Sequence, residues 1–341
     1  MMTKFSFLDD YSEGCHPAIL TALTRSNMAQ QTAYGEDEYS NSARVLIQSK
    51  LENQSSIINF VAGGTLANII IISSLLRRHE GIISASTGHI ATRETGAIEA
   101  VGHKIITVDK KDGKLTSGDI RRVLAENAHV PHMVKPRLVY ISNATETGRI
   151  YTKSELELIS QTCRENSLIF FLDGARLGVA LTSLNNDVSL ADLARLTDVF
   201  WIGGTKVGAL IGEAIVINRH EFAADFRFHI KQRGALLAKG RLLGVQFQEL
   251  FGKDLFFSAS QKANALAEKL SKAILRSGYE LDSPTETNQV FPILPNTLIE
   301  TLEMDFRFYK WRVYDKSHSV LRLVTSWATL EREVDKLISM L

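Results

Sequence analysis

Short apolar runs alternate with longer segments of helical period through the first 250 residues of this chain. Fully apolar runs of this length are typical of buried strands in a mainly parallel sheet, because helices cover both faces of such a sheet. The clearest expected strands are residues 56–61, 81–85, 104–108, 137–141, 168–172, 198–202 and 213–217. Residues 66–78, 117–127 and 153–165 are expected helices, the last opened by a capping box of Thr152 and Glu155. The pattern predicts an α/β fold with a mostly parallel sheet of about seven strands flanked by helices.

The pattern changes after about residue 250. A long helical segment, residues 257–276, is followed by the short apolar runs 289–293 and 320–324 and by a closing helix from about Thr329. We expect a smaller α+β domain here. The predicted division is an N-terminal segment of residues 1–15, a large domain of residues 16–250 and a small C-terminal domain of residues 251–341.

The charge balance argues against whole classes of partner. The 39 Lys and Arg residues are nearly matched by 38 Asp and Glu residues, so no broad cationic field would attract nucleic acid or anionic membranes. Cys15 and Cys163 fit no metal-binding or redox spacing, which favours a reducing compartment. The N-terminus lacks the apolar core of a secretory signal, and the longest apolar run, Ile69 to Ile72, is too short to span a bilayer. We therefore expect a soluble, cytoplasmic protein without a metal site, a nucleic acid partner or a membrane partner.

Four segments carry residues suited to chemistry, and each lies at the edge where open α/β sheets bind ligands. The first is Gly63-Gly64-Thr65. Glycines let the backbone approach an anion, and free N–H groups at a helix N-terminus point at it, so Gly64 and Thr65 are candidates to bind a phosphate. The alternative is a plain turn between a strand and a helix. The segment lacks the patterns of a P-loop and of a dinucleotide-binding turn.

The second segment ends an apolar strand on Asp173, with Arg176 three residues later. A carboxylate at this place can lie against the nitrogen of a pyridine ring and keep it protonated, which strengthens the ring as an electron acceptor. The alternative is a structural pair between Asp173 and Arg176, or a helix cap.

The third segment places Lys206 in a glycine-rich turn, and the fourth places His89 at the start of a helix. A lysine that must reach into a closed site and form a Schiff base needs small neighbours, and burial can lower its pKa. The alternative for Lys206 is electrostatic binding of phosphate from a loop. An imidazole at a helix start could stack on an aromatic cofactor or move protons, although a single histidine also serves as a cap or surface residue.

Read together, these segments occur in the order used by the pyridoxal-phosphate enzymes of the aspartate aminotransferase type. Within that class the chain resembles the threonine aldolase and β-eliminating lyase family. The matching stretches are Tyr34-Gly35-Glu36-Asp37, Gly63 to Asn68, Gly88-His89-Ile90, Glu94-Thr95-Gly96-Ala97, Asp173 to Leu177, Thr205 to Gly208 and Leu321 to Thr325. The resemblance implies the fold of the PLP-dependent transferases of type I and pyridoxal 5′-phosphate as the cofactor.

The resemblance also implies roles for residues around that cofactor. Gly64 and Thr65 would bind the phosphate. His89 would stack on the ring, Asp173 would hold the ring nitrogen and Lys206 would form the Schiff base.

Further residues would serve the substrate and the assembly. Arg176 and Arg322 would lie near the cofactor and the substrate carboxylate, with Arg322 the better carboxylate ligand. His132 corresponds to a family histidine near the substrate hydroxyl. Tyr34 belongs to a stretch that reaches toward the neighbouring subunit's site. The resemblance thus implies a homodimer or homotetramer with sites shared across a subunit interface.

Three stretches depart from the family pattern. Asp9-Asp10-Tyr11 replaces the usual Arg-Ser-Asp near the N-terminus. The arginine of a Gly-Gly-Gly-Met-Arg-Gln run aligns with Ala238, and the basic residues that could substitute for it are Lys231, Arg233 and Lys239. The Glu-Asn-Thr-His-Asn stretch corresponds to residues 142–146, which have lost the histidine. These changes leave the substrate less well determined than the cofactor.

The expected reaction is a retro-aldol cleavage of a small β-hydroxy-α-amino acid of the L-threonine or L-allo-threonine type to glycine and an aldehyde. A base must remove the hydroxyl proton, and His89, His132 and a bound water are the candidates. One alternative is another lyase reaction with the same cofactor on a β-substituted amino acid, such as β-elimination or cleavage of a phenylserine-type substrate. The other is a catalytically idle protein that binds a ligand.

Overall fold

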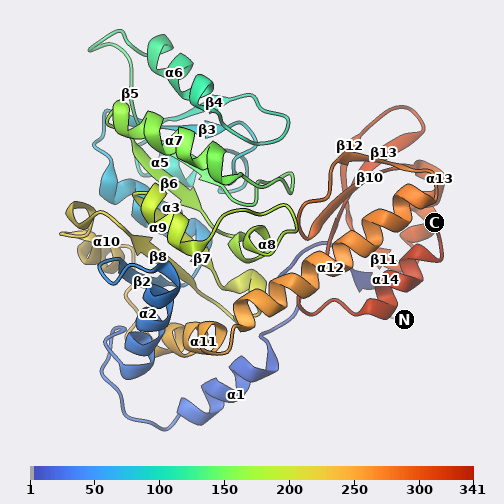
Figure 1. Ribbon diagram of the computed structural model, residues 1–341, viewed down its shortest axis with the longest axis horizontal. Coiled ribbons are helices and arrows are strands. Elements are labelled where there is room, and N and C mark those ends of the chain that lie inside the picture. Colours follow the sequence, from blue (N-terminus) through green and yellow to red (C-terminus); the bar gives the residue numbers. More distant parts are fainter. Residues whose placement is uncertain (1–3) are drawn as a thin grey trace.

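The computed structural model describes residues 4–341 and contains a large and a small sheet joined by a long helix (Figure 1). The large sheet has seven strands in the order β2-β8-β7-β6-β5-β3-β4. They are β2 (Ile57–Val61), β3 (Glu80–Ala85), β4 (Ile105–Val108), β5 (Lys135–Ser142), β6 (Ile169–Asp173), β7 (Val199–Gly203) and β8 (Glu213–Ile217). Only β8 runs antiparallel to its neighbours, β7 and β2. The predicted seven-stranded, mostly parallel sheet is confirmed.

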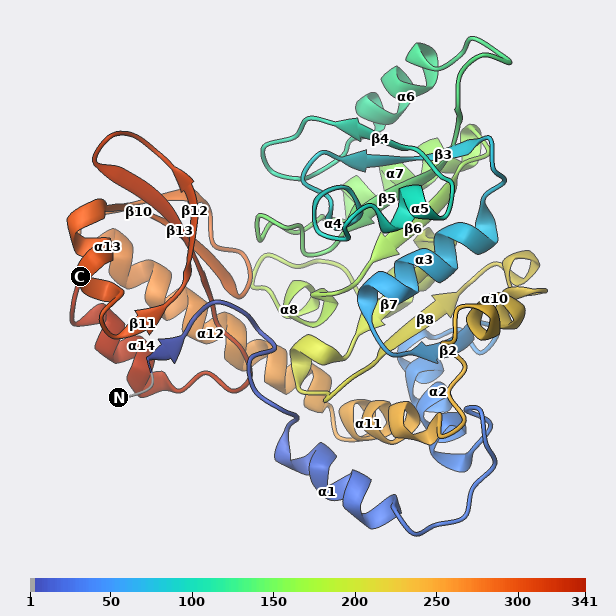
Figure 2. The ribbon, with the colours of Figure 1, turned by 180° about the vertical axis from the view of Figure 1, so that it is seen from behind.

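Helices cover both faces of the large sheet (Figures 1 and 2). Alternate strand residues point to opposite faces, so Phe170 and Leu172 join one apolar core while Ile169 and Phe171 join the other. The first core is closed by α2 (Glu38–Leu51), α6 (Ser117–Glu126), α7 (Lys153–Glu165), α9 (Leu190–Leu196) and α11 (Arg241–Gly252). The second core is closed by α3 (Gly64–Leu75), α5 (Ala97–Ala100) and α10 (Phe226–Gln232).

The helix boundaries follow local capping signals. The predicted capping box opens α7, where Thr152 accepts from the backbone N–H of Glu155 and the Glu155 side chain accepts from Thr152 N–H. Helix α3 begins at Gly64, two residues earlier than expected, and its N-cap Gly63 supplies no side-chain cap. The first turn of α3 therefore keeps unpaired N–H groups that face outward from the helix end.

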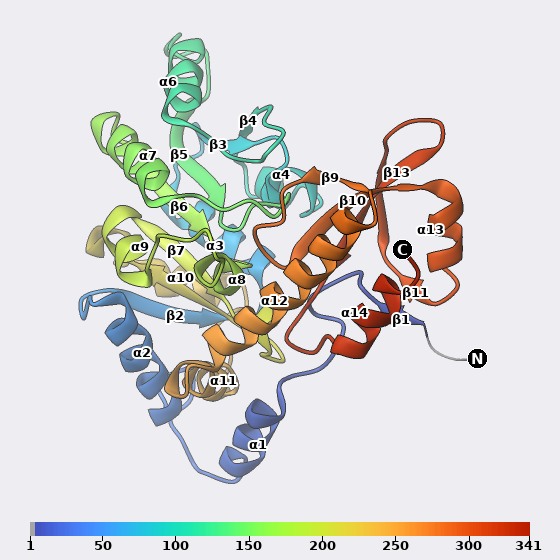
Figure 3. The same cartoon turned by 45° about the vertical axis from the view of Figure 1, so that its right-hand side comes forward.

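The small sheet is antiparallel, with the order β12-β13-β10-β9. Its strands are β9 (Glu280–Ser283), β10 (Gln289–Pro295), β12 (Tyr309–Val313) and β13 (His318–Val324). It packs on α12 (Leu255–Arg276), α13 (Asn296–Leu302) and α14 (Glu331–Ile338). Leu266, Leu270 and Ile274 of α12 are spaced for one helix face and enter this core. Figure 3 shows α12 running from the large sheet to the small one.

The N-terminal segment belongs structurally to the small sheet region before the chain crosses to α1 (Pro17–Ser26). Strand β1 (Phe5–Ser6) pairs in parallel with β11 (Phe306–Arg307), and the carbonyl oxygen of Phe7 accepts from Val324 N–H at 2.9 Å. The first three residues of the predicted segment 1–15 lie outside the described residues. They include part of the N-terminus considered for a secretory signal. Within residues 4–341 no helix is long and apolar enough to cross a membrane.

Candidate active site

The carboxyl ends of the central strands meet at one edge of the large sheet, beside the small domain. Ser142 at the end of β5 is the register partner of Asp173 at the end of β6, and Lys206 follows β7 by three residues. His89 opens α4 (His89–Thr92) after β3, which is parallel to β5. Gly63 follows β2 at this same edge, because Val61 and Gly203 both pair with Glu213. Parallel strand ends thus gather four separate segments into one site.

Asp173 receives three protein donors although it is almost fully buried. Its Oδ2 accepts from the hydroxyl of Tyr140 at 2.6 Å and from Nδ2 of Asn68 at 3.2 Å. Its Oδ1 accepts from the backbone N–H of Ala175 at 2.9 Å. Burial, and then the charge of Asp173, raises the pKa of Tyr140 well above its usual value, so this hydroxyl remains a donor. The carboxylate is rigidly held at the centre of the edge.

A second hydrogen-bonded chain orients His89. Its Nδ1 lies 2.8 Å from Oε1 of Glu94, whose side chain is fully buried. The same Glu94 oxygen accepts from Asn68 Nδ2 at 2.7 Å, and Asn68 Oδ1 accepts from the Trp201 indole at 3.1 Å. Asn68 therefore links the supports of Asp173 and His89. The imidazole ring itself remains about one-third exposed, at 36%.

Lys206 sits in a 3₁₀ turn, Thr205–Val207, that is tied to the start of β8. Glu213 accepts from the backbone N–H of Gly204 and from the hydroxyl of Thr205, both at 2.9 Å. Gly208 closes the turn with a φ of +107°, a conformation that favours glycine. The glycines predicted to flank the lysine thus shape a tight turn that presents its side chain at the edge.

The electrostatics around Lys206 suit a reactive amine. Burial, and then the neighbouring guanidinium of Arg176, lowers the pKa of Lys206 to about 8, against the opposing effect of Asp10 and Asp173. Burial raises the pKa of Glu213 to about 7. A lysine of this pKa is partly neutral near pH 7, and only the neutral amine is a nucleophile.

Arg176 is already paired within the protein. Its Nε and Nη2 donate to the two carboxylate oxygens of Asp10 at 2.8 and 3.0 Å, and Asn288 also donates to Asp10 at 2.9 Å. Burial alone would raise the pKa of Asp10, but Arg176 and Lys206 bring it down to about 2. The Arg176 charge is therefore compensated by a residue of the N-terminal segment.

Arg322 lacks such compensation. Its Nε donates to Gln289 at 2.9 Å, and its guanidinium carbon lies 5.6 Å from the ring centroids of Tyr309 and Trp311. No carboxylate within residues 4–341 forms an ion pair with it, and burial followed by the charge of Arg176 lowers its pKa to about 10. A desolvated cation without a counter-charge is costly, so the arrangement is suited to an anionic ligand.

The end of α3 next to this site has room for an anion. A Cβ on Gly63 would meet nothing within 4 Å, whereas one on Gly64 would lie 2.8 Å from the Trp201 ring. The absence of a side-chain cap leaves the first N–H groups of the helix available, as at phosphate sites. Among residues 4–341 no group of His, Cys, Asp and Glu side chains could hold a metal ion.

A family model described as Beta-eliminating lyase matches residues 8–296. The chain belongs to the beta-eliminating lyase family. A low specificity L-threonine aldolase from a Pseudomonas species is 34% identical over 333 residues, which cover 96% of this chain and 94% of that protein. A threonine aldolase structure from Leishmania major is 47% identical with a TM-score of 0.97 and 98% coverage of both chains. An aspartate aminotransferase from Thermus thermophilus, 15% identical with a TM-score of 0.69 and covering 99% of this chain and 90% of that one, shares the fold.

The structure does not place His132 at this site. His132 precedes β5, whereas Ser142 ends it, and the seven residue steps of this strand separate its ends by about 23 Å. The exposed His132 ring instead packs against His129 at 4.7 Å. The sequence shows that this histidine is near a strand of the site, but it does not show at which end of the strand the site lies. The geometry therefore gives no support to its expected role beside the substrate hydroxyl.

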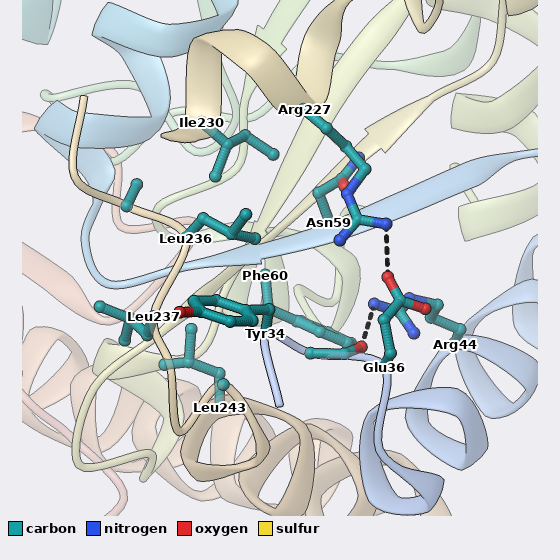
Figure 4. A pocket seen from close by; sticks show the side chains of 13 residues that line it. Tyr34, Glu36, Arg44, Asn59, Phe60, Arg227, Ile230, Leu236, Leu237 and Leu243 are labelled. Atoms are coloured by element: carbon teal, nitrogen blue, oxygen red, sulfur yellow. Dashed lines mark hydrogen bonds and ion pairs between the residues drawn. The ribbon is translucent and has the colours of Figure 1, made fainter. Parts of the chain in front are cut away.

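Tyr34 lies elsewhere on the lyase, at the edge of the sheet formed by β2. It lines a pocket with Phe60, Arg227 and Leu236, and none of the groups around Lys206 borders that pocket (Figure 4). The Nζ of Lys231 lies 4.9 Å from the Tyr34 ring centroid. Within one chain Tyr34 is therefore not a substrate ligand.

Several residues of the site carry only a weak signal in the sequence. Asn68 and Tyr140 are polar side chains inside otherwise apolar, fully buried segments, which is the signal that could have found them. Asp10 was noted only as a departure from the family pattern, and its partnership with Arg176 spans 166 positions. Such a pairing leaves no mark in local sequence.

Proposed function

We propose that this lyase is a pyridoxal-phosphate-dependent aldolase that cleaves a small β-hydroxy-α-amino acid to glycine and an aldehyde. The observation that carries the proposal is the convergence of Lys206, Asp173 and the uncompensated Arg322 at one sheet edge. The similarity to proteins named threonine aldolases supports a substrate of the L-threonine or L-allo-threonine type.

The residues present fit pyridoxal phosphate. The uncapped start of α3 at Gly64 and Thr65 suits the phosphate, buried Asp173 suits the ring nitrogen, and the amine of Lys206 suits the aldehyde. When bound, the cofactor supplies an electron acceptor for the bond that breaks at Cα.

The protein's own residues then position the substrate. Lys206 would hold the cofactor through its amine until the substrate amine takes that place. Arg322 binds the substrate carboxylate with its two free guanidinium nitrogens, the geometry in which arginine binds carboxylates best. Held at the carboxylate and at the amine, the substrate keeps one orientation in which the Cα–Cβ bond faces the ring. The His89 ring, fixed by Glu94, is in place to stack on the cofactor.

The lowered pKa of Lys206 predicts how cofactor capture depends on pH. An amine attacks an aldehyde only when it is neutral, so the capture rate of cofactor-free protein should rise with pH and level off above about 8. An ordinary lysine with its usual value of 10.5 would still be gaining rate at pH 10. Stopped-flow absorbance between pH 6 and 10, with Lys206→Ala as the blank, measures this. A midpoint near 10 would contradict the buried amine.

A product assay tests the proposed function. Purified protein loaded with pyridoxal phosphate is given L-threonine and, separately, L-allo-threonine, and glycine and acetaldehyde are measured. Equal amounts of both products from either substrate are expected. If the absorption band of bound cofactor is seen but no aldehyde is formed, the enzyme breaks another bond or acts on another substrate. If no cofactor binds, the result favours a catalytically idle ligand-binding protein.

We also propose a homodimer or homotetramer in which Tyr34 of one copy faces the site of another. The support is a partly exposed cluster of Tyr34, Phe228, Lys231 and Arg227, in which Phe228 is 74% exposed. Of Lys231, Arg233 and Lys239, we propose Lys231 as the substitute for the family arginine at Ala238, because its Nζ lies 4.9 Å from the Tyr34 ring centroid. If sites are shared, mixing inactive Lys206→Ala and Lys231→Ala subunits should restore activity, because one site of each mixed pair then has both lysines. If the activity of the mixture never exceeds the sum of the activities of the two separate variants, the proposal that subunits share their sites is contradicted.

The near balance of charges supports a small amino acid and further copies of this chain as the partners, without nucleic acid or a membrane. We propose the cytoplasm as the compartment, since Cys15 and Cys163 are both free thiols. Fractionation of cells that produce the full chain checks the location.

A further inference from the structure

The proposed reaction needs a group that accepts the proton of the substrate's β-hydroxyl, and the structure narrows the choice. His132 lies at the far end of β5. The His89 ring is assigned to the face of the cofactor under the proposed function, with its Nδ1 held by the buried Glu94 carboxylate. The carboxyl groups of Asp10 and Asp173 are each occupied by two or more donors, and Glu213 is bound to the turn behind Lys206. Two ionisable groups at this edge remain without an assigned task among the described residues, Tyr11 and Glu146. Burial, and then the charge of Asp9, raises the pKa of Tyr11 to about 12, so Tyr11 keeps its proton and cannot serve as the base.

We propose that Glu146 is the base that accepts the β-hydroxyl proton. Glu146 follows β5 by four residues, in the stretch where the family histidine is missing, and reaches the edge beside His89. The inference rests on the proposed aldolase function and adds to it a catalytic residue.

Glu146 is held by one oxygen only. Its Oε1 accepts from the Ser142 hydroxyl at 2.7 Å and from the backbone N–H of His89 at 2.9 Å. Its Oε2 has no hydrogen-bond partner in the part of the chain that the structure describes, and the side chain is half-buried. The first oxygen therefore fixes the carboxylate against the residue that is in place to stack on the cofactor, and the second is available to a ligand.

The surroundings tune Glu146 for proton transfer. Burial raises its pKa, and the charge of Asp173 adds to this, whereas the Ser142 hydroxyl and His89 act in the opposite direction. Tyr140 and Tyr151 also lie within reach of the Glu146 charge, and each keeps its proton because burial raises its pKa well above the usual value. Arg176, whose pKa is raised, stays positively charged. A base whose pKa moves from the acidic range toward the working pH is more effective, as Brønsted behaviour requires.

The step balances without a further reactant. The β-hydroxyl proton passes to a Glu146 carboxylate oxygen, and the O–H electron pair becomes the second bond of the aldehyde C=O. The Cα–Cβ electron pair stays with Cα, where the bound cofactor would stabilise its negative charge, and takes up a proton from solvent, which yields glycine. Glu146 gives its proton back to solvent, so no oxidant or reductant is needed.

Glu146→Gln tests the assignment, because the amide keeps an oxygen for Ser142 and His89 but cannot accept the proton. The kcat for L-threonine cleavage is expected to fall by roughly 10²–10⁴-fold, the usual contribution of a general base. Exchange of the Cα hydrogen of glycine in D₂O should change by less than about threefold, because glycine has no hydroxyl. The absorption and affinity of bound pyridoxal phosphate should be unchanged.

Two controls separate chemistry from positioning. Ser142→Ala removes the hydroxyl that holds Oε1 but leaves the carboxylate, so cleavage should fall less than about tenfold. The acidic limb of the wild-type pH profile of kcat/KM, where activity rises as Glu146 loses its proton, should disappear in Glu146→Gln.

The outcomes are distinct. Cleavage by Glu146→Gln within threefold of the wild type, or an equal loss of cleavage and of glycine exchange, would overturn the assignment of the base. If the wild type exchanges glycine but releases no aldehyde from any β-hydroxy amino acid, the aldolase proposal fails instead.

Discussion

Replacing Lys206 with alanine is expected to leave the protein folded while abolishing covalent capture of pyridoxal phosphate, and to lower kcat by on the order of 10³-fold or more. The lysine is half-buried with a pKa lowered to about 8, so its removal deletes a poorly solvated cation and should not lower stability. The measurement is borohydride reduction of the loaded protein followed by peptide mapping, together with the aldehyde assay.

Two matched variants sharpen the result. Lys206→Arg retains a cation in the turn but cannot form the covalent bond, so it should be as inactive as the alanine variant. Lys272→Ala removes an exposed lysine of α12 that pairs only with Glu268, and should behave as the wild type. Modified peptide recovered at a lysine other than Lys206, or full activity of Lys206→Ala, would remove the central assignment.

Arg322→Gln should raise the KM for L-threonine by roughly 10²-fold or more, because a buried charge pair with the substrate carboxylate is worth about 2–5 kcal/mol. Within residues 4–341 no carboxylate forms an ion pair with this guanidinium, so the variant should be no less stable than the wild type. Steady-state kinetics and thermal unfolding measure the two effects. Glutamine keeps polarity at the site while it removes the cation and the two-pronged donor geometry.

A neighbouring arginine provides the control. Arg312 lies on β12, the strand that pairs with the strand of Arg322, and its register partner is Val320. It is 46% exposed and paired with Asp282, so Arg312→Gln should leave KM within about twofold. An amino alcohol that lacks the carboxylate should inhibit the wild type and Arg322→Gln equally. If the amino alcohol also loses affinity in Arg322→Gln, the arginine supports the fold of the site and does not bind the carboxylate.

The elements of the large domain were predictable because their signals are local. Buried strands such as β6 and β7 are short apolar runs, and the Thr152 capping box lies within four residues. Lys206 and Asp173 stand directly after such runs, and parallel strands must end at one edge, so their meeting followed from the pattern.

The sequence by itself therefore determined the strand-and-helix order, the glycine-shaped turns and the residues that stand at the strand ends. Only the tertiary structure decided which of the remaining polar residues join them. Asp10 reaches Arg176 across 166 positions, and Asn68 reaches Asp173 across 105. His132 precedes β5 and lies at the end of this strand that is far from the site, whereas Glu146 follows β5 and lies at the site. Secondary structure is encoded in neighbouring residues, whereas side chains from distant segments meet only when the packing of helices on the sheet brings them together.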